Sequence, residues 1–420
     1  MSNWIVTGGT ALRGEVAAQG AKNAALPILA ATLLVDAPVR LLHCPKLVDV
    51  ENMLAILQAL GCTVRYDGDA VEIDASTANS CVLPQALSLK LRSSIFLLGS
   101  VLARFHQAVA SYPGGCEIGN RPIDLHLHGL GRLNVAIEEQ GGRIVCTTPK
   151  LIGAEIDLDY PSVGATENSM LAACRAEGET VIRNAACEPE IVDLQGFLNA
   201  CGFCVAGAGT PTVVISGRTA GHGATYTIMP DRIVTGTYLM AGAITGGDVT
   251  VTDTDPRLLD AVLSKLDGCG CIVRQYQDAV RLRAPKRPIA LPRAETRPYP
   301  GFPTDLQPQL FALLSVAEGT SVLVENVFEN RFKHAQELCR MGGRNNIYDR
   351  TAVITGVRTL HGAQVEAHDL RGGAALVLAG LCAEGETTIA FAERIERGYA
   401  RMDTAVAALG GTIRRKDEPD

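Results

Sequence analysis

The sequence predicts an α/β fold made of six copies of one unit, grouped as two sets of three. Three observations support this prediction. A helical segment of small apolar residues recurs six times, a turn and a β-like run follow it, and each copy reaches a glycine after a second helical pattern. These glycines lie 60 to 81 residues apart, which is too long a period, with too much strand, for an α-solenoid.

The elements of each unit follow in one order. The small-residue helix is expected at 23–34, 93–102, 169–174, 234–244, 306–316 and 373–382. A turn and a strand follow, most clearly at 176–182, 317–324 and 383–389, where Ala-Glu-Gly precedes β-branched residues. The second helix is expected at 51–60, 194–200, 258–266, 335–340 and 402–409. The glycines at the expected helix ends are Gly61, Gly142, Gly202, Gly270, Gly343 and Gly411.

Composition excludes several classes of protein. With 420 residues, 47% of them hydrophobic and 20% charged, the chain can bury a large core and form two domains. A net charge of −7 argues against a nucleic-acid-binding surface. The longest apolar run, 24–35, contains Pro27 and is too short to span a bilayer, and no signal-peptide pattern opens the chain. Thirteen scattered cysteines indicate a reducing compartment, so we expect a cytoplasmic protein whose thiols are mostly buried.

Two cysteine pairs form the most obvious metal signal. Cys201 with Cys204 and Cys269 with Cys271 both fall at the helix-end glycine of their units, without zinc-finger spacing and without a histidine pair. We therefore expect these cysteines to be packing residues and expect no metal site.

One cysteine differs from the others in its surroundings. Cys116 lies in the Gly- and Pro-rich segment 112–122, which favours a surface loop. Arg121 follows five residues later, and a nearby guanidinium stabilises a thiolate. Cys116 is thus a candidate nucleophile or proton donor on a loop that can open and close, and the alternative is an inert loop cysteine.

Charged residues recur at the expected helix starts. The first helices begin near Lys22 and Asn23, Arg92, Glu167 and Asn168, Asp231 and Arg232, Asp305, and Arg371, and the second helices near Arg121 and Asp124, Arg331, and Arg397. A cation at a helix N-terminus opposes the helix dipole, at a cost of up to about 1 kcal/mol, which a bound anion would offset. The recurrence predicts a site for phosphate and carboxylate groups. For any single arginine, the alternative is a solvated surface charge.

Asp305 carries a negative charge, unlike the basic residues at most of the other helix starts. Its segment, 300–308, favours a helix-capping acid, with Thr304 as an alternative cap. The functional alternative is a carboxylate base that faces a hydroxyl group and the anions held by the basic residues.

Over essentially its whole length, the chain resembles the UDP-N-acetylglucosamine 1-carboxyvinyltransferase family. The resemblance rests on nine motifs in order, among them Gly-Ala-Lys-Asn at 20–23 and Cys-Glu-Ile-Gly-Asn-Arg at 116–121. The motifs lie at 20–29, 91–96, 113–126, 162–166, 188–193, 302–305, 328–332, 369–371 and 396–399.

The resemblance implies two globular domains, each of three βαβαββ repeats in a pseudo-threefold arrangement, known as an inside-out α/β barrel, with the active site between them. The first domain would span 21–229 and carry the Cys116 loop. The second would combine 1–20 with 230–420 and carry Asp305, Arg331, Arg371 and Arg397.

It also implies an activity: transfer of the enolpyruvyl group of phosphoenolpyruvate to the 3′-hydroxyl of UDP-N-acetylglucosamine, with release of phosphate and without metal or organic cofactor. This reaction begins peptidoglycan precursor synthesis and cell-wall biogenesis. Cys116 would protonate the methylene carbon, Asp305 would take the hydroxyl proton, and no nucleic acid or membrane partner is expected. Lys22, Arg121 and Arg397 would hold phosphoenolpyruvate, with Arg92, Arg331 and Arg371 nearby. The UDP-sugar would contact Asn23, Arg121, Pro122, Ile123, Asp124, Leu125, Ser162, Val163, Gly164, Asp305 and Val327.

The chain departs from the family pattern at several positions. Glu117 and Asn120 stand where small residues are expected, and Phe96 stands where tryptophan is frequent. Val48 stands where some members have a lysine. The segment Arg394-Ile-Glu-Arg397 stands where the family more usually has a segment that contains histidine. None of these changes removes a charge that the reaction requires. Two alternatives stay open: a related transferase acting on shikimate 3-phosphate, and a catalytically silent paralogue that binds UDP-sugar and regulates a partner.

Overall fold

The computed structural model describes residues 2–68, 70–112, 123–217 and 221–417. They divide into two compact units. The first, which we call the insert unit, contains the described residues between Gly20 and Met229, and the second, the terminal unit, contains those up to Gln19 and from Pro230 onward. Each unit is described by itself below.

The insert unit contains three repeats of helices and strands. The first comprises α1 (Lys22–Ala31), the 3-10 turn η1 (Thr32–Leu34), β3 (Val39–Leu42), α2 (Val48–Ala59), β4 (Thr63–Asp67), β5 (Ala70–Asp74) and β13 (Thr225–Thr227). The second comprises α3 (Gln85–Ser88), η2 (Arg92–Phe96), α4 (Leu97–Phe105), β6 (Gln107–Ser111), α5 (Asp124–Arg132), β7 (Ala136–Gln140) and β8 (Arg143–Thr147). The third comprises β9 (Glu155–Asp157), α6 (Val163–Ala173), β10 (Glu179–Arg183), α7 (Pro189–Ala200), β11 (Cys204–Ala206) and β12 (Thr212–Ser216).

The terminal unit repeats the pattern three times. Its first repeat comprises β2 (Arg13–Ala17), α8 (Arg232–Ile244), β14 (Asp248–Thr252), η3 (Pro256–Leu258), α9 (Asp260–Gly268), β15 (Ile272–Gln275) and β16 (Ala279–Arg283). The second comprises β17 (Ala294–Glu295), η4 (Thr304–Leu306), α10 (Gln307–Leu314), β18 (Thr320–Val324), α11 (His334–Arg340), β19 (Arg344–Tyr348) and β20 (Thr351–Thr355). The third comprises β21 (Gln364–Glu366), α12 (Leu370–Cys382), β22 (Glu386–Ala390), α13 (Glu393–Glu396), α14 (Met402–Ala408), β23 (Thr412–Asp417) and β1 (Ser2–Thr7).

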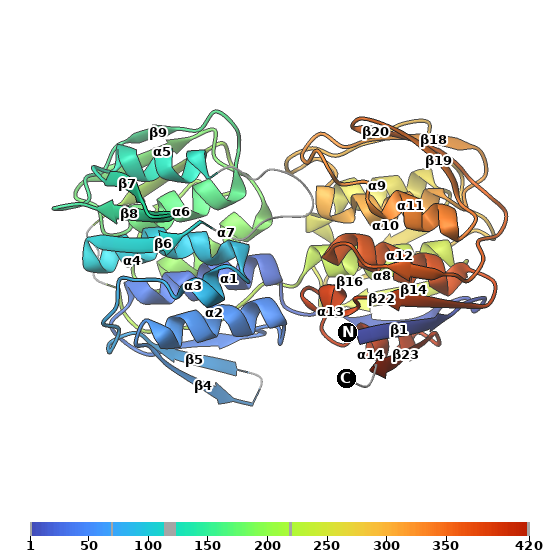
Figure 1. The fold of residues 1–420 in the computed structure, drawn as a ribbon, viewed down its shortest axis with the longest axis horizontal. Helices are drawn as coiled ribbons and strands as arrows, with labels where there is room; N and C mark the ends of the chain where they lie inside the picture. Colours follow the sequence, from blue (N-terminus) through green and yellow to red (C-terminus); the bar gives the residue numbers. More distant parts are fainter. Residues whose placement is uncertain (1, 69, 113–122, 218–220, 418–420) are drawn as a thin grey trace. The chain divides into compact units, whose positions relative to one another are not determined.

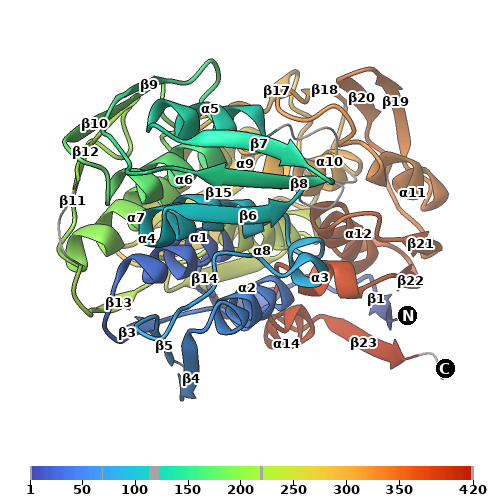
Figure 2. The ribbon, with the colours of Figure 1, turned by 60° about the vertical axis from the view of Figure 1, so that its left-hand side comes forward.

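Each repeat forms its own small sheet, and these sheets share one pairing scheme except for β6-β8-β7, in which both described strand pairs are antiparallel. The orders β11-β12-β10-β9, β17-β18-β20-β19 and β15-β16-β14-β2 each contain one parallel pair at an edge and antiparallel pairs elsewhere. In the order β21-β22-β1-β23, the chain's first strand takes the place that β20 holds in the preceding repeat, pairing antiparallel with β22 and β23. Figure 2 shows the sheet β6-β8-β7, whose strands β6 and β8 contact α4.

Helices rather than strands occupy the centre of each unit. In the insert unit α1, α4 and α6 contact one another, and in the terminal unit α8, α10 and α12 do so, between the strands of the surrounding sheets (Figure 1). Every residue of α8 and α10 is buried. Small residues permit this packing: a Cβ on Gly99 would lie 2.3 Å from the backbone oxygen of Asn168 in α6. The predicted α/β fold is confirmed, and the structure places its recurring small-residue helices at the core of each unit.

The helix-end glycines are confirmed for three repeats and corrected for three. Gly61, Gly202 and Gly270 adopt left-handed φ angles of 97°, 88° and 86° after α2, α7 and α9. After α11 and α14, the left-handed residues are instead Gly342 and Gly410, one position before the predicted Gly343 and Gly411. Gly142 lies in the β7–β8 turn, and Asn134, with φ 68°, follows α5 in its place. Asparagine tolerates this conformation better than most residues, and a search for glycine alone overlooks it.

Three predicted helix starts were also wrong. Helix α6 begins at Val163 because the Ser162 hydroxyl caps it, so Glu167 and Asn168 lie inside the helix. Arg331 precedes α11 by three residues, and Arg397 ends α13 rather than beginning a helix. Of the cysteine pairs, Cys201, Cys269 and Cys271 are buried as predicted, whereas Cys204 is exposed at the start of β11.

Candidate active site

Lys22 begins α1 and is nearly buried. Its Nζ donates to Asp49 Oδ2 at 3.1 Å, and Asp49 lies in the first turn of α2 with its side chain 4% exposed. Within the described chain, α1 has neither a side-chain cap at its preceding residue, Ala21, nor an acidic residue in its first turn. The positive end of this helix and the Lys22 ammonium therefore lie together, with half-buried Asn23 as the next residue.

The starts of α5 and α6 meet around a histidine that the sequence did not single out. A Cβ on Gly164 would lie 2.9 Å from both the His126 and Phe96 rings, so these three residues pack tightly. Asn168 Nδ2 lies 3.3 Å from His126 Nδ1. Burial, assisted by the charge of Arg92, lowers the pKa of His126 to about 4, so the ring is neutral at pH 7.

This contact brings together several predicted sugar-binding residues. Ile123 is buried, Asp124 exposed and Leu125 half-buried at the start of α5, and Ser162, Val163 and Gly164 are half-buried at the start of α6. The Ser162 Oγ accepts from the Ala165 N–H at 3.4 Å. The mid-helix Glu167 is fully buried, and burial, reinforced by Glu190 and Glu188, raises its pKa well above the ordinary value.

In the terminal unit, Asp305 lies between two buried arginines. Arg331 Nη2 donates to Asp305 Oδ1 and Arg371 Nη2 donates to Asp305 Oδ2, each at 3.0 Å. The Arg331 and Arg371 side chains are only 2% and 4% exposed, whereas that of Asp305 is 24% exposed. The two guanidinium groups stabilise the ionised carboxylate and fix its plane, while one face stays accessible to solvent.

The capping interpretation of Asp305 is wrong. Within the described chain, neither η4 nor α10 has a side-chain cap, and the Asp305 oxygens accept from arginines instead. Thr304, the alternative cap, donates its hydroxyl to Glu325 Oε2 at 3.0 Å. The spacing suited a cap, but the two arginines reach Asp305 from 26 and 66 residues away.

The segment after α13 carries Arg397 and lies against Arg371. Arg397 is half-buried, and Tyr399, two residues later, is buried with its ring 5.5 Å from the Arg371 guanidinium. Burial opposes the charge of Arg371, but the nearby Asp305, Tyr399 and Asp231 raise its pKa on balance. Tyr399 Oη also accepts from Gln309 Nε2 at 3.0 Å, which anchors the segment to α10.

Other predicted residues are placed as follows. Val327 is half-buried after β18 and Arg92 is half-buried at the start of η2. Cys116, Arg121 and Pro122 lie outside the described residues.

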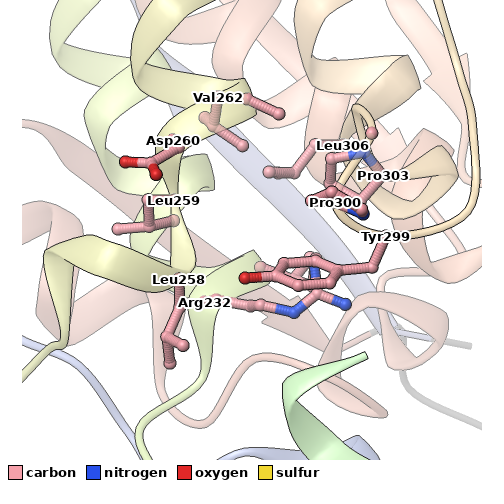
Figure 3. Close-up of a pocket in the computed structure, with 12 residues that line it drawn as sticks. Arg232, Leu258, Leu259, Asp260, Val262, Tyr299, Pro300, Pro303 and Leu306 are labelled. Atoms are coloured by element: carbon pink, nitrogen blue, oxygen red, sulfur yellow. The ribbon is translucent and has the colours of Figure 1, made fainter. Parts of the chain in front are cut away.

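A small pocket of about 40 Å³ lies in the terminal unit, beside the Asp305 segment. Its lining includes Pro303, which precedes η4, and Leu306, which is the last residue of η4, together with Arg232 and Tyr299. Figure 3 shows the Arg232 side chain alongside the Tyr299 ring, and the guanidinium lies 5.5 Å from the ring centre. Leu306 and Pro303 give it an apolar wall, and its lining contains none of the predicted catalytic residues that the structure describes, Lys22, Asp305 and Arg397.

Two searches of the described residues gave negative results. They contain no group of three or more His, Cys, Asp or Glu side chains arranged to hold a metal ion. Among the same residues, no helix combines the length and apolarity needed to cross a membrane.

Comparison with known proteins gives consistent matches along the whole chain. Residues 6–404 match the family model described as EPSP synthase (3-phosphoshikimate 1-carboxyvinyltransferase). UDP-N-acetylglucosamine 1-carboxyvinyltransferase 2 of Caldanaerobacter subterraneus is 51% identical over 415 residues, covering 99% of this chain and 100% of that protein. UDP-N-acetylglucosamine 1-carboxyvinyltransferase 1 of Carboxydothermus hydrogenoformans is 48% identical over 417 residues, covering 99% and 98%.

Solved structures agree in fold. The enolpyruvyl transferase NikO from Streptomyces tendae matches with a TM-score of 0.91 and 28% identity, covering 100% of both chains. EPSP synthase from Acinetobacter baumannii matches with a TM-score of 0.78 and 19% identity, covering 99% of this chain and 100% of that one. The helix-centred repeats, the full-length match to the family model and the relatives near 50% identity agree, and the chain belongs to the EPSP synthase family of enolpyruvyl transferases.

Proposed function

We propose that this protein transfers the enolpyruvyl group of phosphoenolpyruvate to the 3′-hydroxyl of UDP-N-acetylglucosamine and releases phosphate, the first committed step of peptidoglycan precursor synthesis. The observation that carries the proposal is identity of about 50%, over nearly the full length, to proteins named for this reaction. The matched EPSP synthase structure is only 19% identical, which supports a shared fold but not a shared acceptor. A cytoplasmic location is part of the proposal, supported by free thiols at all twelve described cysteines.

The reaction requires an acid, a base and anion-binding groups. The sugar 3′-oxygen forms a bond to C2 of phosphoenolpyruvate, its proton goes to Asp305, and the methylene carbon takes a proton from Cys116. The C2–O bond to phosphate then breaks while the C3 methyl group returns a proton to the Cys116 thiolate, which regenerates the double bond, and Asp305 passes its proton to the departing phosphate. Every atom is accounted for by the two substrates and these two side chains, so the cycle needs no cofactor.

The proposed base has suitable geometry. Asp305 is held ionised by Arg331 and Arg371, so it is ready to accept a proton, and its exposed face can approach a hydroxyl. The same cations make the carboxylate a weaker base. Proton transfer must therefore coincide with bond formation to C2, when the hydroxyl becomes acidic.

The anion-binding groups differ in their surroundings. Lys22 combines a nearly buried ammonium with the uncapped start of α1, which suits a phosphate or carboxylate. We assign phosphoenolpyruvate to Lys22, Arg121 and Arg397, with Arg92, Arg331 and Arg371 contributing positive charge nearby. We assign the UDP-sugar to Asn23, to 121–125 and 162–164, and to Asp305 and Val327.

One assay tests the proposal. Phosphate release should require phosphoenolpyruvate and UDP-N-acetylglucosamine together, and should not occur when shikimate 3-phosphate replaces the sugar nucleotide. Phosphate release with phosphoenolpyruvate and shikimate 3-phosphate, but not with UDP-N-acetylglucosamine, would overturn the assigned acceptor. Tight UDP-sugar binding without any release would favour the silent regulatory paralogue.

A further inference from the structure

Glu325 is a buried carboxylate at the end of β18, outside the residues that the sequence singled out. Its side chain is 0% exposed. Oε1 accepts from the Thr296 hydroxyl at 2.8 Å and from the backbone N–H groups of Val327 and Phe328 at 2.8 and 3.1 Å. Oε2 accepts from the Thr304 hydroxyl at 3.0 Å. One side chain thus joins three separate segments of the terminal unit.

Two of those segments carry residues assigned to the reaction. Thr304 directly precedes Asp305, and its backbone oxygen also accepts from Arg331 Nη2 at 3.2 Å. Val327, whose N–H points to Glu325, belongs to the assigned sugar site. The third segment supplies an anchor, because Thr296 Oγ1 also accepts from the Asn326 N–H at 2.9 Å.

A packing role alone does not account for a carboxylate at this position. Burying a carboxyl group is costly unless hydrogen bonds replace its hydration, and an apolar side chain of similar volume would avoid that cost. Four donors surround Glu325, two of them the backbone N–H groups of Val327 and Phe328. This buried hydrogen-bond network holds the backbone near Thr296, Thr304 and Val327 in fixed positions.

We propose that Glu325 is a positioning residue: through Thr304 it sets the orientation of Asp305, and through its other oxygen it shapes the 327–328 turn against the sugar. The inference rests on the proposed function. It predicts that the two oxygens act on different kinetic constants, because Oε2 reaches the base and Oε1 reaches the sugar-binding turn.

The first test breaks the link to the base alone. Thr304→Val keeps the side-chain shape but removes the hydroxyl, so kcat should fall about 10-fold while KM for UDP-N-acetylglucosamine stays within about twofold, since small displacements of a catalytic group cost large factors in rate. Thr304→Ser retains the hydroxyl and should recover most of the loss. Thr387→Val is the control: Thr304 is half-buried and Thr387 in β22 is fully buried, but among the described residues the Thr387 hydroxyl has no hydrogen-bond partner to lose.

The second test asks whether Thr304 acts through Glu325. In Glu325→Gln the amide oxygen can serve the three donors of Oε1, while the NH₂ group cannot accept from the Thr304 hydroxyl and can only donate to its oxygen, so kcat should fall part of the way toward the Thr304→Val value. The double variant should lose no more than Thr304→Val alone. Each variant's melting temperature is measured alongside, since a purely structural role would lower it without changing turnover per folded enzyme.

The outcomes separate the two claims. Phosphate release by the unaltered protein tests the proposed function, and its failure would remove the inference as well. If that release is normal, a Thr304→Val kcat within twofold of the original, or additive losses in the double variant, would overturn the positioning role and leave the proposed function intact.

Discussion

The substitution Asp305→Asn separates the contribution of Asp305 to the stability of the fold from its proposed role as a base. The amide keeps one oxygen that can accept from an arginine, but its NH₂ group cannot accept from the other. One of two charge-assisted hydrogen bonds, each 3.0 Å long, is therefore lost. Such a bond contributes about 1.5 to 3 kcal/mol. Because Arg331 and Arg371 are almost fully buried, water cannot readily replace the missing partner, and we expect a stability loss of about 2 to 3 kcal/mol.

The loss of turnover should be separate from the loss of stability. The amide cannot take the 3′-hydroxyl proton, so kcat should fall on the order of 100-fold or more, which corresponds to about 2.7 kcal/mol of barrier. Phosphate release gives the rate, and urea unfolding gives the stability. Asp248→Asn is the control, because Asp248 forms an ion pair with the exposed Arg281. Loss of this surface ion pair should change neither the rate of phosphate release nor the stability greatly. A destabilised Asp305→Asn protein with a normal rate would make Asp305 structural only and leave the mechanism without a base.

Three further predictions concern the insert unit and the loop. Cys116→Ser should lose most turnover and keep UDP-sugar binding in a titration, and unaltered turnover would remove its role as the acid. Lys22→Ala should raise KM for phosphoenolpyruvate roughly 10- to 100-fold and change sugar affinity much less, so equal losses for both ligands would contradict the assignment. Glu167→Gln should become increasingly more stable than the original as pH rises above about 4.5. The pKa of the buried carboxyl is raised in the folded state, so the original protein loses stability as its unfolded chain ionises. Urea unfolding near pH 5 and pH 8 measures that difference, and a constant difference would contradict the buried, protonated Glu167.

Much of the fold could be predicted because its signals are local. The Ala-Glu-Gly turns precede β10, β18 and β22 as expected, and the small-residue pattern marks all six central helices. Errors arose where the structure uses another residue to begin or end a helix. Ser162 caps α6, so this helix begins earlier in the sequence than expected, and Asn134 adopts the left-handed conformation expected of a glycine after α5. Both are physically ordinary substitutions that a single-residue rule overlooks.

The candidate site was less predictable because its contacts are distant in sequence. Local spacing correctly drew attention to Asp305 but suggested a cap, since nothing near it reveals that Arg331 and Arg371 converge on its two oxygens. Glu325 gave no signal at all, because a glutamate at the end of a strand is usually exposed. His126 lay inside a recognised motif, but only the packing of Gly164 and Phe96 reveals its burial.

Strand β1 is synthesised long before the strands with which it pairs. Trp4 pairs with Ile389, which the ribosome adds 385 residues later, a delay of roughly 20 to 80 s at ordinary rates of translation. Throughout that time Ser2–Thr7, whose tryptophan ends fully buried, must remain unpaired, while residues 20–229 have already emerged and can fold. The last repeat of the terminal unit can therefore close only after β23 has been synthesised, so its assembly in the cell is paced by translation.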